Sequence, residues 1–200
     1  MRVLCCALAL ALALPLTGCW VYTANPLAER PEDYTFDVRL LGTWVQPDSG
    51  CTLQLTRFFD QPRYNVHYSA PPDKQGNGCL LDEGQSAMFE GWLAEIGDTR
   101  FLDITPVDRQ PQHHDLPLHS FYRVRLDTAG VLTLTPLDHE WVQGQLLQER
   151  PNLVGRTIPG GDNIVLTSST KQLRDFLRDF GSNQDAFKPS GDLSFRRRAP

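Results

Sequence analysis

Histidines and carboxylates that lie close together in the sequence are the first candidates for chemistry in this chain. His113, His114, Asp115 and His119 fall within seven residues, and imidazole and carboxylate groups of this kind bind zinc, copper or nickel. Adjacent histidines in an extended chain point in opposite directions, and Pro117 disfavours a helix that would gather them. A polar loop with one locally paired histidine explains the same residues. His113, His114 and His119 are therefore weak metal candidates, and we expect no metal and no cofactor.

A serine and a lysine three positions apart are the second candidate. Ser168-Ser169-Thr170-Lys171 has the S-x-x-K spacing at the start of a predicted helix, where penicillin-binding serine enzymes place their nucleophile. No S-D-N or K-T-G motif accompanies it, and hydroxyl groups that cap the helix explain these residues without chemistry. The carboxylates Asp82, Glu83 and Asp103 lack an evident partner in the sequence. We therefore expect no catalytic residues, and a hydrolase is the least favoured function.

Aromatic side chains offer a third possibility, which is binding rather than catalysis. Those in the predicted strands either line a cavity for an apolar ligand or fill the core. The residues that we expect at such a pocket are Trp44, Trp92, Phe101 and Tyr122.

The elements that position these residues are mainly strands. Apolar and polar residues alternate with a period of two in many short segments, a pattern typical of antiparallel strands. The segments are 40–45, 51–56, 64–69, 88–96, 101–104, 121–126 and 131–134.

Two helices are predicted among these strands. Residues 138–148 lack alternation, and residues 169–180 combine a capping box with an i, i+3, i+4, i+7 apolar stripe before Gly181. A last strand follows at 192–196. The fold class is therefore α+β and rich in β structure, with the C-terminal helix packed on an antiparallel barrel.

The N-terminus resembles that of bacterial lipoproteins. Leu16-Thr17-Gly18-Cys19 matches their lipobox, and it follows Arg2 and an apolar segment that is too short to span a bilayer. The resemblance implies that residues 1–18 are a signal peptide and that Cys19 is lipidated. Trp20 stands where an aspartate would favour retention in the inner membrane, so the resemblance favours the outer membrane, with the domain facing the periplasm.

The lipobox also sets the expected domain organisation. Residues 19–36 contain the lipidated cysteine and a tether with two prolines, and residues 37–200 form one β-rich domain. The formal net charge of −5 argues against nucleic acid as a partner. Membrane attachment therefore depends on the lipid.

The cysteine pairing follows from this resemblance. Cys5 and Cys6 leave with the signal peptide, and Cys19 carries the lipid. Cys51 and Cys79 then remain in an oxidising compartment, where a disulfide is the expected state.

A second, weaker resemblance concerns the domain itself. Gly42-x-Trp44 at the first predicted strand resembles the opening signature of lipocalins, barrels that enclose small apolar ligands. In that family a basic residue near the last strand stacks on the tryptophan, a part that Arg196 or Arg197 would play here. The resemblance implies a lipocalin-like or partly open barrel.

The whole arrangement also resembles uncharacterised bacterial lipoproteins, through Phe101-Leu102-Asp103, His119-x-Phe121 and the start of the second helix. We expect a non-catalytic, lipid-anchored envelope protein that binds a small apolar ligand or lipid. The alternative is an interaction module that holds another envelope protein. A cavity within the sheet would favour the first function, and a filled core beneath an exposed apolar patch the second.

Overall fold

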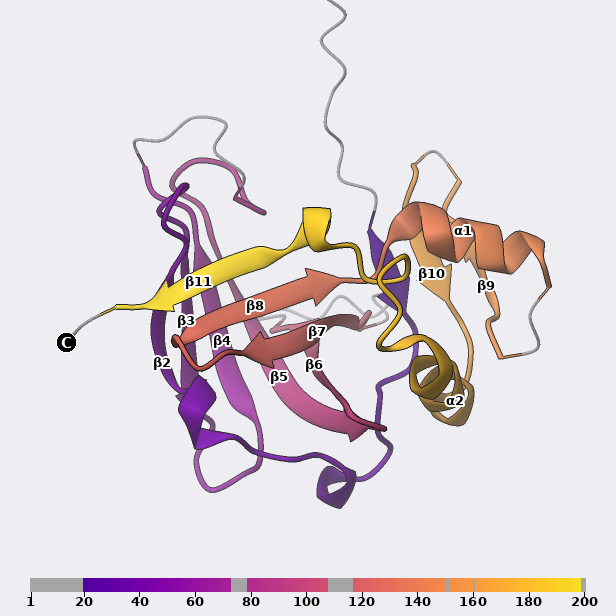
Figure 1. Ribbon diagram of the computed structural model, residues 1–200, viewed down its shortest axis with the longest axis horizontal. Helices are drawn as coiled ribbons and strands as arrows, with labels where there is room; N and C mark the ends of the chain where they lie inside the picture. Colours follow the sequence, from indigo (N-terminus) through magenta and orange to yellow (C-terminus); the bar gives the residue numbers. More distant parts are fainter. Residues whose placement is uncertain (1–19, 73–78, 108–116, 150–151, 160, 199–200) are drawn as a thin grey trace, which may run out of the picture.

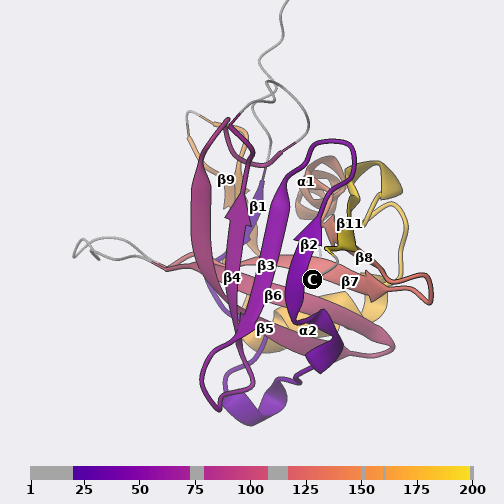
Figure 2. The ribbon, with the colours of Figure 1, turned by 90° about the vertical axis from the view of Figure 1, so that its left-hand side faces the viewer.

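The computed structural model describes residues 20–72, 79–107, 117–149, 152–159 and 161–198. Its main element is a barrel of eight antiparallel strands (Figures 1 and 2). The strands are β2 (Gly42–Val45), β3 (Thr52–Arg57), β4 (Tyr64–Ser69), β5 (Ser86–Ile96), β6 (Thr99–Pro106), β7 (Ser120–Leu126), β8 (Val131–Pro136) and β11 (Leu193–Arg197). The last strand, β11, pairs with both β8 and β2. The lipocalin-like barrel is thereby confirmed, and it is closed rather than partly open.

The alternation of the strands decides what fills the barrel. In β4, Tyr64, Val66 and Tyr68 are buried, and the residues between them are partly exposed. In contrast, the middle of β6 is buried on both faces, from Phe101 to Ile104. One part of the barrel wall is therefore apolar on its outside as well as its inside.

Two helices and a small second sheet cover that part of the wall (Figure 1). The helices are α1 (His139–Leu147) and α2 (Thr170–Phe180), and the sheet contains β1 (Val21–Thr23), β10 (Ile164–Leu166) and β9 (Gly155–Thr157). Together they bury the outward side chains of the barrel in a second core, which includes Ala94, Ile96, Phe101, Phe121, Leu173, Phe176 and Leu177. None of the helices in the described part of the chain is long and apolar enough to cross a membrane.

Both predicted helices are confirmed, and side chains cap both of their N-termini. Asp138 accepts a hydrogen bond from the Trp141 N–H at the start of α1, at 2.8 Å. Ser169 and Gln172 form the predicted capping box of α2. Gly181 follows α2 with an ordinary φ of −62°, but a Cβ there would lie 2.5 Å from the Leu177 carbonyl oxygen. Close packing, not a left-handed backbone, is thus the reason for this glycine.

The prediction of a tether over residues 20–36 was wrong. Val21–Thr23 forms β1, which pairs in parallel with β10, and Leu27 is completely buried. Further along, a short 3-10 helix, η1 (Pro31–Asp33), precedes a β-bridge between Thr35 and Leu93. Two prolines and weak periodicity look like a linker in the sequence, but the backbone here is held at several points by distant partners that the sequence does not show. Residues 20–36 are therefore part of the folded domain.

Candidate ligand cavity

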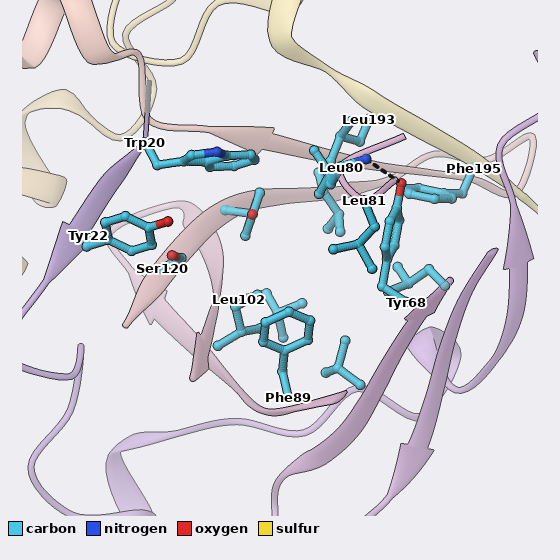
Figure 3. Close-up of a pocket in the computed structure, with 15 residues that line it drawn as sticks. Trp20, Tyr22, Tyr68, Leu80, Leu81, Phe89, Leu102, Ser120, Leu193 and Phe195 are labelled. Carbon is cyan, nitrogen blue, oxygen red and sulfur yellow. Dashed lines mark hydrogen bonds between the residues drawn. The ribbon is translucent and has the colours of Figure 1, made fainter. Parts of the chain in front are cut away.

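A cavity of about 220 Å³ lies inside one end of the barrel, which we call the open end (Figure 3). Its wall consists of inward side chains from every barrel strand except β2, namely Leu53, Val66, Tyr68, Phe89, Leu102, Ile104, Ser120, Tyr122, Leu134, Leu193 and Phe195. The other lining residues lie outside these strands and are Trp20, Tyr22, Leu80 and Leu81. Among the described residues no charged side chain lines this space, so the cavity suits an uncharged, apolar group.

The N-terminal segment forms one side of the opening. The Trp20 N–H donates to Asn163 Oδ1 at 2.9 Å, and its carbonyl oxygen accepts from the Ile164 N–H at 2.9 Å. These bonds continue the pairing of β1 with β10. Figure 3 shows the Trp20 ring above the cavity, with Tyr22 and Ser120 on the same side. Trp20 is therefore held in place on both sides of its α-carbon.

The loop between β4 and β5 forms the opposite side. Its Leu80 N–H donates to the Tyr68 hydroxyl at 3.1 Å. As predicted, Cys79 forms a disulfide with the buried Cys51, and their α-carbons are 5.9 Å apart. The disulfide therefore fixes Leu80 and Leu81 at the opening.

Hydroxyl groups are the main polar groups of the cavity wall. Tyr122 is only 6% exposed, and burial raises the pKa of its phenol, so this group is uncharged at neutral pH. No described residue forms a hydrogen bond with the hydroxyls of Tyr22, Ser120 or Tyr122. These hydroxyls are open to the cavity, where a polar atom of a ligand can pair with them. The cavity therefore suits an apolar ligand with one polar end.

The other end of the barrel, the closed end, is filled. Trp44 is 1% exposed, and its indole N–H donates to the Leu40 carbonyl oxygen at 2.8 Å. The Arg197 guanidinium lies over the Trp44 ring, with 4.4 Å between Cζ and the ring centroid. It also donates to the carbonyl oxygens of Arg39 and Leu41. Of the two arginines proposed for this stacking, Arg197 is the one that makes it.

Residues before β2 complete the closed end. A short 3-10 helix, η2 (Val38–Leu40), lies there, and the Phe36 ring stacks on Tyr64 with centroids 4.7 Å apart. The Tyr64 hydroxyl donates to the Asp37 carbonyl oxygen at 3.2 Å and accepts from its N–H at 2.8 Å. Burial raises the pKa of Tyr64 to about 12. Its hydroxyl thus remains a hydrogen-bond donor at any physiological pH.

Of the four aromatic residues predicted at a pocket, Tyr122 alone lines the cavity. Trp44 fills the closed end instead. Trp92 and Phe101 point out of the barrel, where Trp92 packs against Tyr34 at a centroid distance of 6.0 Å and Phe101 joins the core under the helices. The prediction was wrong for Trp92 and Phe101 because alternation does not tell which face of a strand lines the inside, and for Trp44 because its ring fills the other end of the interior.

One predicted histidine takes part in a buried polar cluster on the outside of the barrel. Asp103 is completely buried and accepts from the Leu27 N–H at 2.8 Å and the Tyr34 hydroxyl at 3.3 Å. Its other oxygen lies 2.8 Å from His119 Nδ1. The cluster fastens the N-terminal segment to β6, which is the local pairing expected for one histidine.

In the described part of the chain, no group of three or more His, Cys, Asp or Glu residues could hold a metal ion. His113 and His114 lie outside the described residues.

The S-x-x-K motif is used for structure. The Ser168 hydroxyl is buried, accepts from the Val154 N–H at 2.7 Å and donates to its carbonyl oxygen at 3.2 Å. The Lys171 ammonium pairs with Asp175, one turn further along α2, at 2.5 Å. The two groups have different partners, so the arrangement provides no activated nucleophile.

Of the fifteen lining residues, sequence reasoning named only Tyr122, and four of those that it missed lie outside the barrel strands, namely Trp20, Tyr22, Leu80 and Leu81. The sequence offered a signal for two of these residues through their neighbours, because Trp20 follows the cysteine of the predicted lipobox and Leu80 follows a cysteine predicted to form a disulfide.

Comparison with protein-family models found no match, and searches among curated proteins and solved structures found none either.

Proposed function

We propose that this protein is a non-catalytic, lipid-anchored protein of the bacterial envelope that binds a small apolar ligand or lipid inside its barrel. The observation that carries the binding function is the apolar cavity at the open end, with its unpaired hydroxyls. The anchor follows from the lipobox at Leu16-Thr17-Gly18-Cys19. The cavity favours this function over an interaction module, which we expected to have a filled core.

The size of the cavity limits the ligand. An engineered apolar cavity of about 150 Å³ holds benzene. A space of about 220 Å³ therefore suits a bicyclic ring or one short hydrocarbon chain, and it excludes a large cofactor. The hydroxyls of Tyr22, Ser120 and Tyr122 favour a ligand with a hydroxyl, ester or amide at one end.

Binding is tested on residues 20–200, exported behind a signal peptide that does not lead to lipidation, so that the disulfide forms. We expect an aminonaphthalene fluorophore to bind with micromolar affinity and to be displaced by medium-chain alcohols. Native mass spectrometry of the same sample would detect lipid that co-purifies.

Two neighbouring positions of β3 provide a matched pair of variants. Leu53→Trp places a bulky ring in the cavity and should abolish fluorophore binding, whereas Gln54→Trp places it on the exposed outer face and should leave binding unchanged. Equal binding by both variants would show that the probe binds elsewhere. No binding by the wild type, together with a partner recovered by crosslinking, would favour the interaction module.

The anchor is tested separately by intact mass and membrane fractionation of the full chain. We expect acyl groups on Cys19, a protein in the outer-membrane fraction, and loss of both lipid and membrane attachment in Cys19→Ser. A wild-type chain that carries no acyl mass would overturn the anchor and leave the cavity as a separate question.

A further inference from the structure

The position of Trp20 connects the two parts of the proposed function, the anchor and the cavity. Hydrogen bonds to Asn163 and Ile164 hold its backbone at the edge of the open end, and its ring lines the cavity. Cys19 is bonded to Trp20, and consecutive α-carbons are about 3.8 Å apart. Any group attached to Cys19 therefore begins within a few ångströms of the cavity opening.

From this geometry we infer that the barrel encloses one of the acyl chains carried by its own Cys19. The inference rests on the proposed lipidation and names the occupant of the proposed cavity. One chain folds back past Trp20 into the open end with as many of its methylene groups as about 220 Å³ holds, and the other chains stay in the membrane. The protein is then its own first ligand, and a free ligand binds only when this chain leaves.

The distribution of polar groups in the cavity fits a chain attached at Cys19. The hydroxyls of Tyr22 and Ser120 lie on the side of Trp20 (Figure 3), whereas the most deeply buried part of the wall is purely apolar and contains Leu53, Val66 and Leu102. The amide or ester that joins an acyl chain to the cysteine is polar, and the rest of the chain is hydrocarbon. A chain that starts at Cys19 thus places its linkage near hydroxyl donors and its methylene groups against apolar side chains.

Attachment to the same molecule favours this occupant over a free lipid. A short covalent connection gives an effective concentration on the order of millimolar, which exceeds that of most soluble apolar ligands. Each methylene that leaves water contributes roughly 0.8 kcal/mol, in the cavity as in the bilayer. Moving a chain between the two therefore costs little.

Membrane attachment tolerates the loss of one chain. A single chain binds a membrane reversibly, and two are needed for stable anchoring. A lipoprotein with several chains can place one of them in its barrel and stay anchored with the others.

The test compares acylated protein, purified from membranes, with unacylated residues 20–200 in the same detergent, after intact mass has verified the acyl groups. We expect the acylated form to bind the aminonaphthalene fluorophore at least tenfold more weakly. Equal affinity in the two forms would overturn the inference while leaving the anchor and the cavity in place. So would a free phospholipid recovered in stoichiometric amount from the acylated barrel.

A second measurement assigns any effect to the cavity rather than to the membrane lipid in general. An acyl chain enclosed in the barrel stabilises the folded state, so it should raise the melting temperature of the acylated wild type above that of the unacylated wild type. This difference should disappear in Leu53→Trp, which fills the cavity, and persist in Gln54→Trp, which does not. The same difference in both variants, or none in the wild type, would contradict the inference. If Leu53→Trp does not fold, the fluorophore comparison on the wild type decides.

Discussion

The two ends of the barrel are built from the same strands but are closed in different ways. At the closed end, Trp44 lies across the barrel axis beneath Arg197, and its only polar atom is satisfied four residues away by Leu40. At the open end, Trp20 and the 79–81 segment lie over the opening, and about 220 Å³ beneath them is hollow. One end is filled by a side chain of the barrel itself, and the other is only covered.

The difference follows from where the closing groups are held. The closed end uses a residue of β2 and the residues just before it, so the large ring points into the barrel from the barrel's own wall. The open end uses segments whose backbones are fixed outside the barrel, by β10 on one side and by the Cys51–Cys79 disulfide on the other. Side chains held from outside cover the cavity without filling it, so one end of the barrel is tightly packed and the other is hollow.

The largest effect should come from emptying the closed end. Trp44→Ala removes a fully buried ring and should lower the free energy of unfolding by about 3–5 kcal/mol. At the open end, Phe89→Ala faces an existing void from a half-buried position and should cost less than about 2 kcal/mol. Urea denaturation of both variants checks the difference. Similar losses would mean that the two ends are packed equally well.

Removing the disulfide should come next, and it should affect the open end selectively. The bond spans a sequence separation of 28 residues, and the chain-entropy model gives about 3–4 kcal/mol for a loop of this size. The double variant Cys51→Ala/Cys79→Ala should therefore be less stable by this amount and bind the fluorophore more weakly, because Leu80 and Leu81 lose their attachment. Denaturation and a binding titration measure the two effects. Unchanged affinity in a folded double variant would show that the loop does not shape the cavity.

A smaller effect is expected where the N-terminal segment is fastened. Asp103→Asn keeps the size of the side chain but removes the charge that accepts from Leu27 and Tyr34, at a cost of about 1–3 kcal/mol. Amide hydrogen exchange should accelerate in residues 20–36 more than in the barrel strands. Asp98→Asn, at an exposed turn, serves as the control and should change neither. Equal exchange in both variants would contradict the role of Asp103.

The smallest effect is a pH dependence at the closed end. Hydrogen bonds from Arg39, with a further one from Arg100, lower the pKa of Asp37 from 3.8 to about 2. Because the folded-state pKa is depressed, the stabilisation is complete above the ordinary value and is lost as the pH falls towards 2. After solvent screening we expect a loss of about 1 kcal/mol across this interval. Denaturation of the wild type and Asp37→Asn from pH 5 to pH 2 measures it, and identical slopes for the two proteins would refute it.

Much of the fold could be predicted because its signals are local. Alternation located the barrel strands, and the capping box together with the apolar stripe located α2, since both depend on residues within a few positions of each other. The resemblance of Gly42-x-Trp44 to the lipocalin opening predicted that Arg196 or Arg197 stacks on Trp44, as one of them does. The register of β11 against β2 places Arg197 directly opposite Trp44, so Arg197 is the arginine that stacks on the ring.

The cavity could not be predicted in the same way. Alternation divides a strand into two faces, but β5 and β6 bury side chains on both, so Trp92 and Phe101 looked no different from residues that line the inside. The lining residues Trp20 and Leu80 lie outside the barrel strands, where no period exists to follow.

The sequence by itself determined the barrel strands and both helices but not β1 or β9, and the lipobox resemblance predicted the Cys51–Cys79 pair and the anchor at Cys19. Only the tertiary structure decided that β11 closes the barrel and that one end is hollow. It also decided that the residues after Cys19 belong to the folded domain rather than to a tether. The physical reason is range: local periodicity and capping act within a few residues, whereas the hydrogen bonds of Trp20 and Leu27 reach partners 143 and 76 positions away.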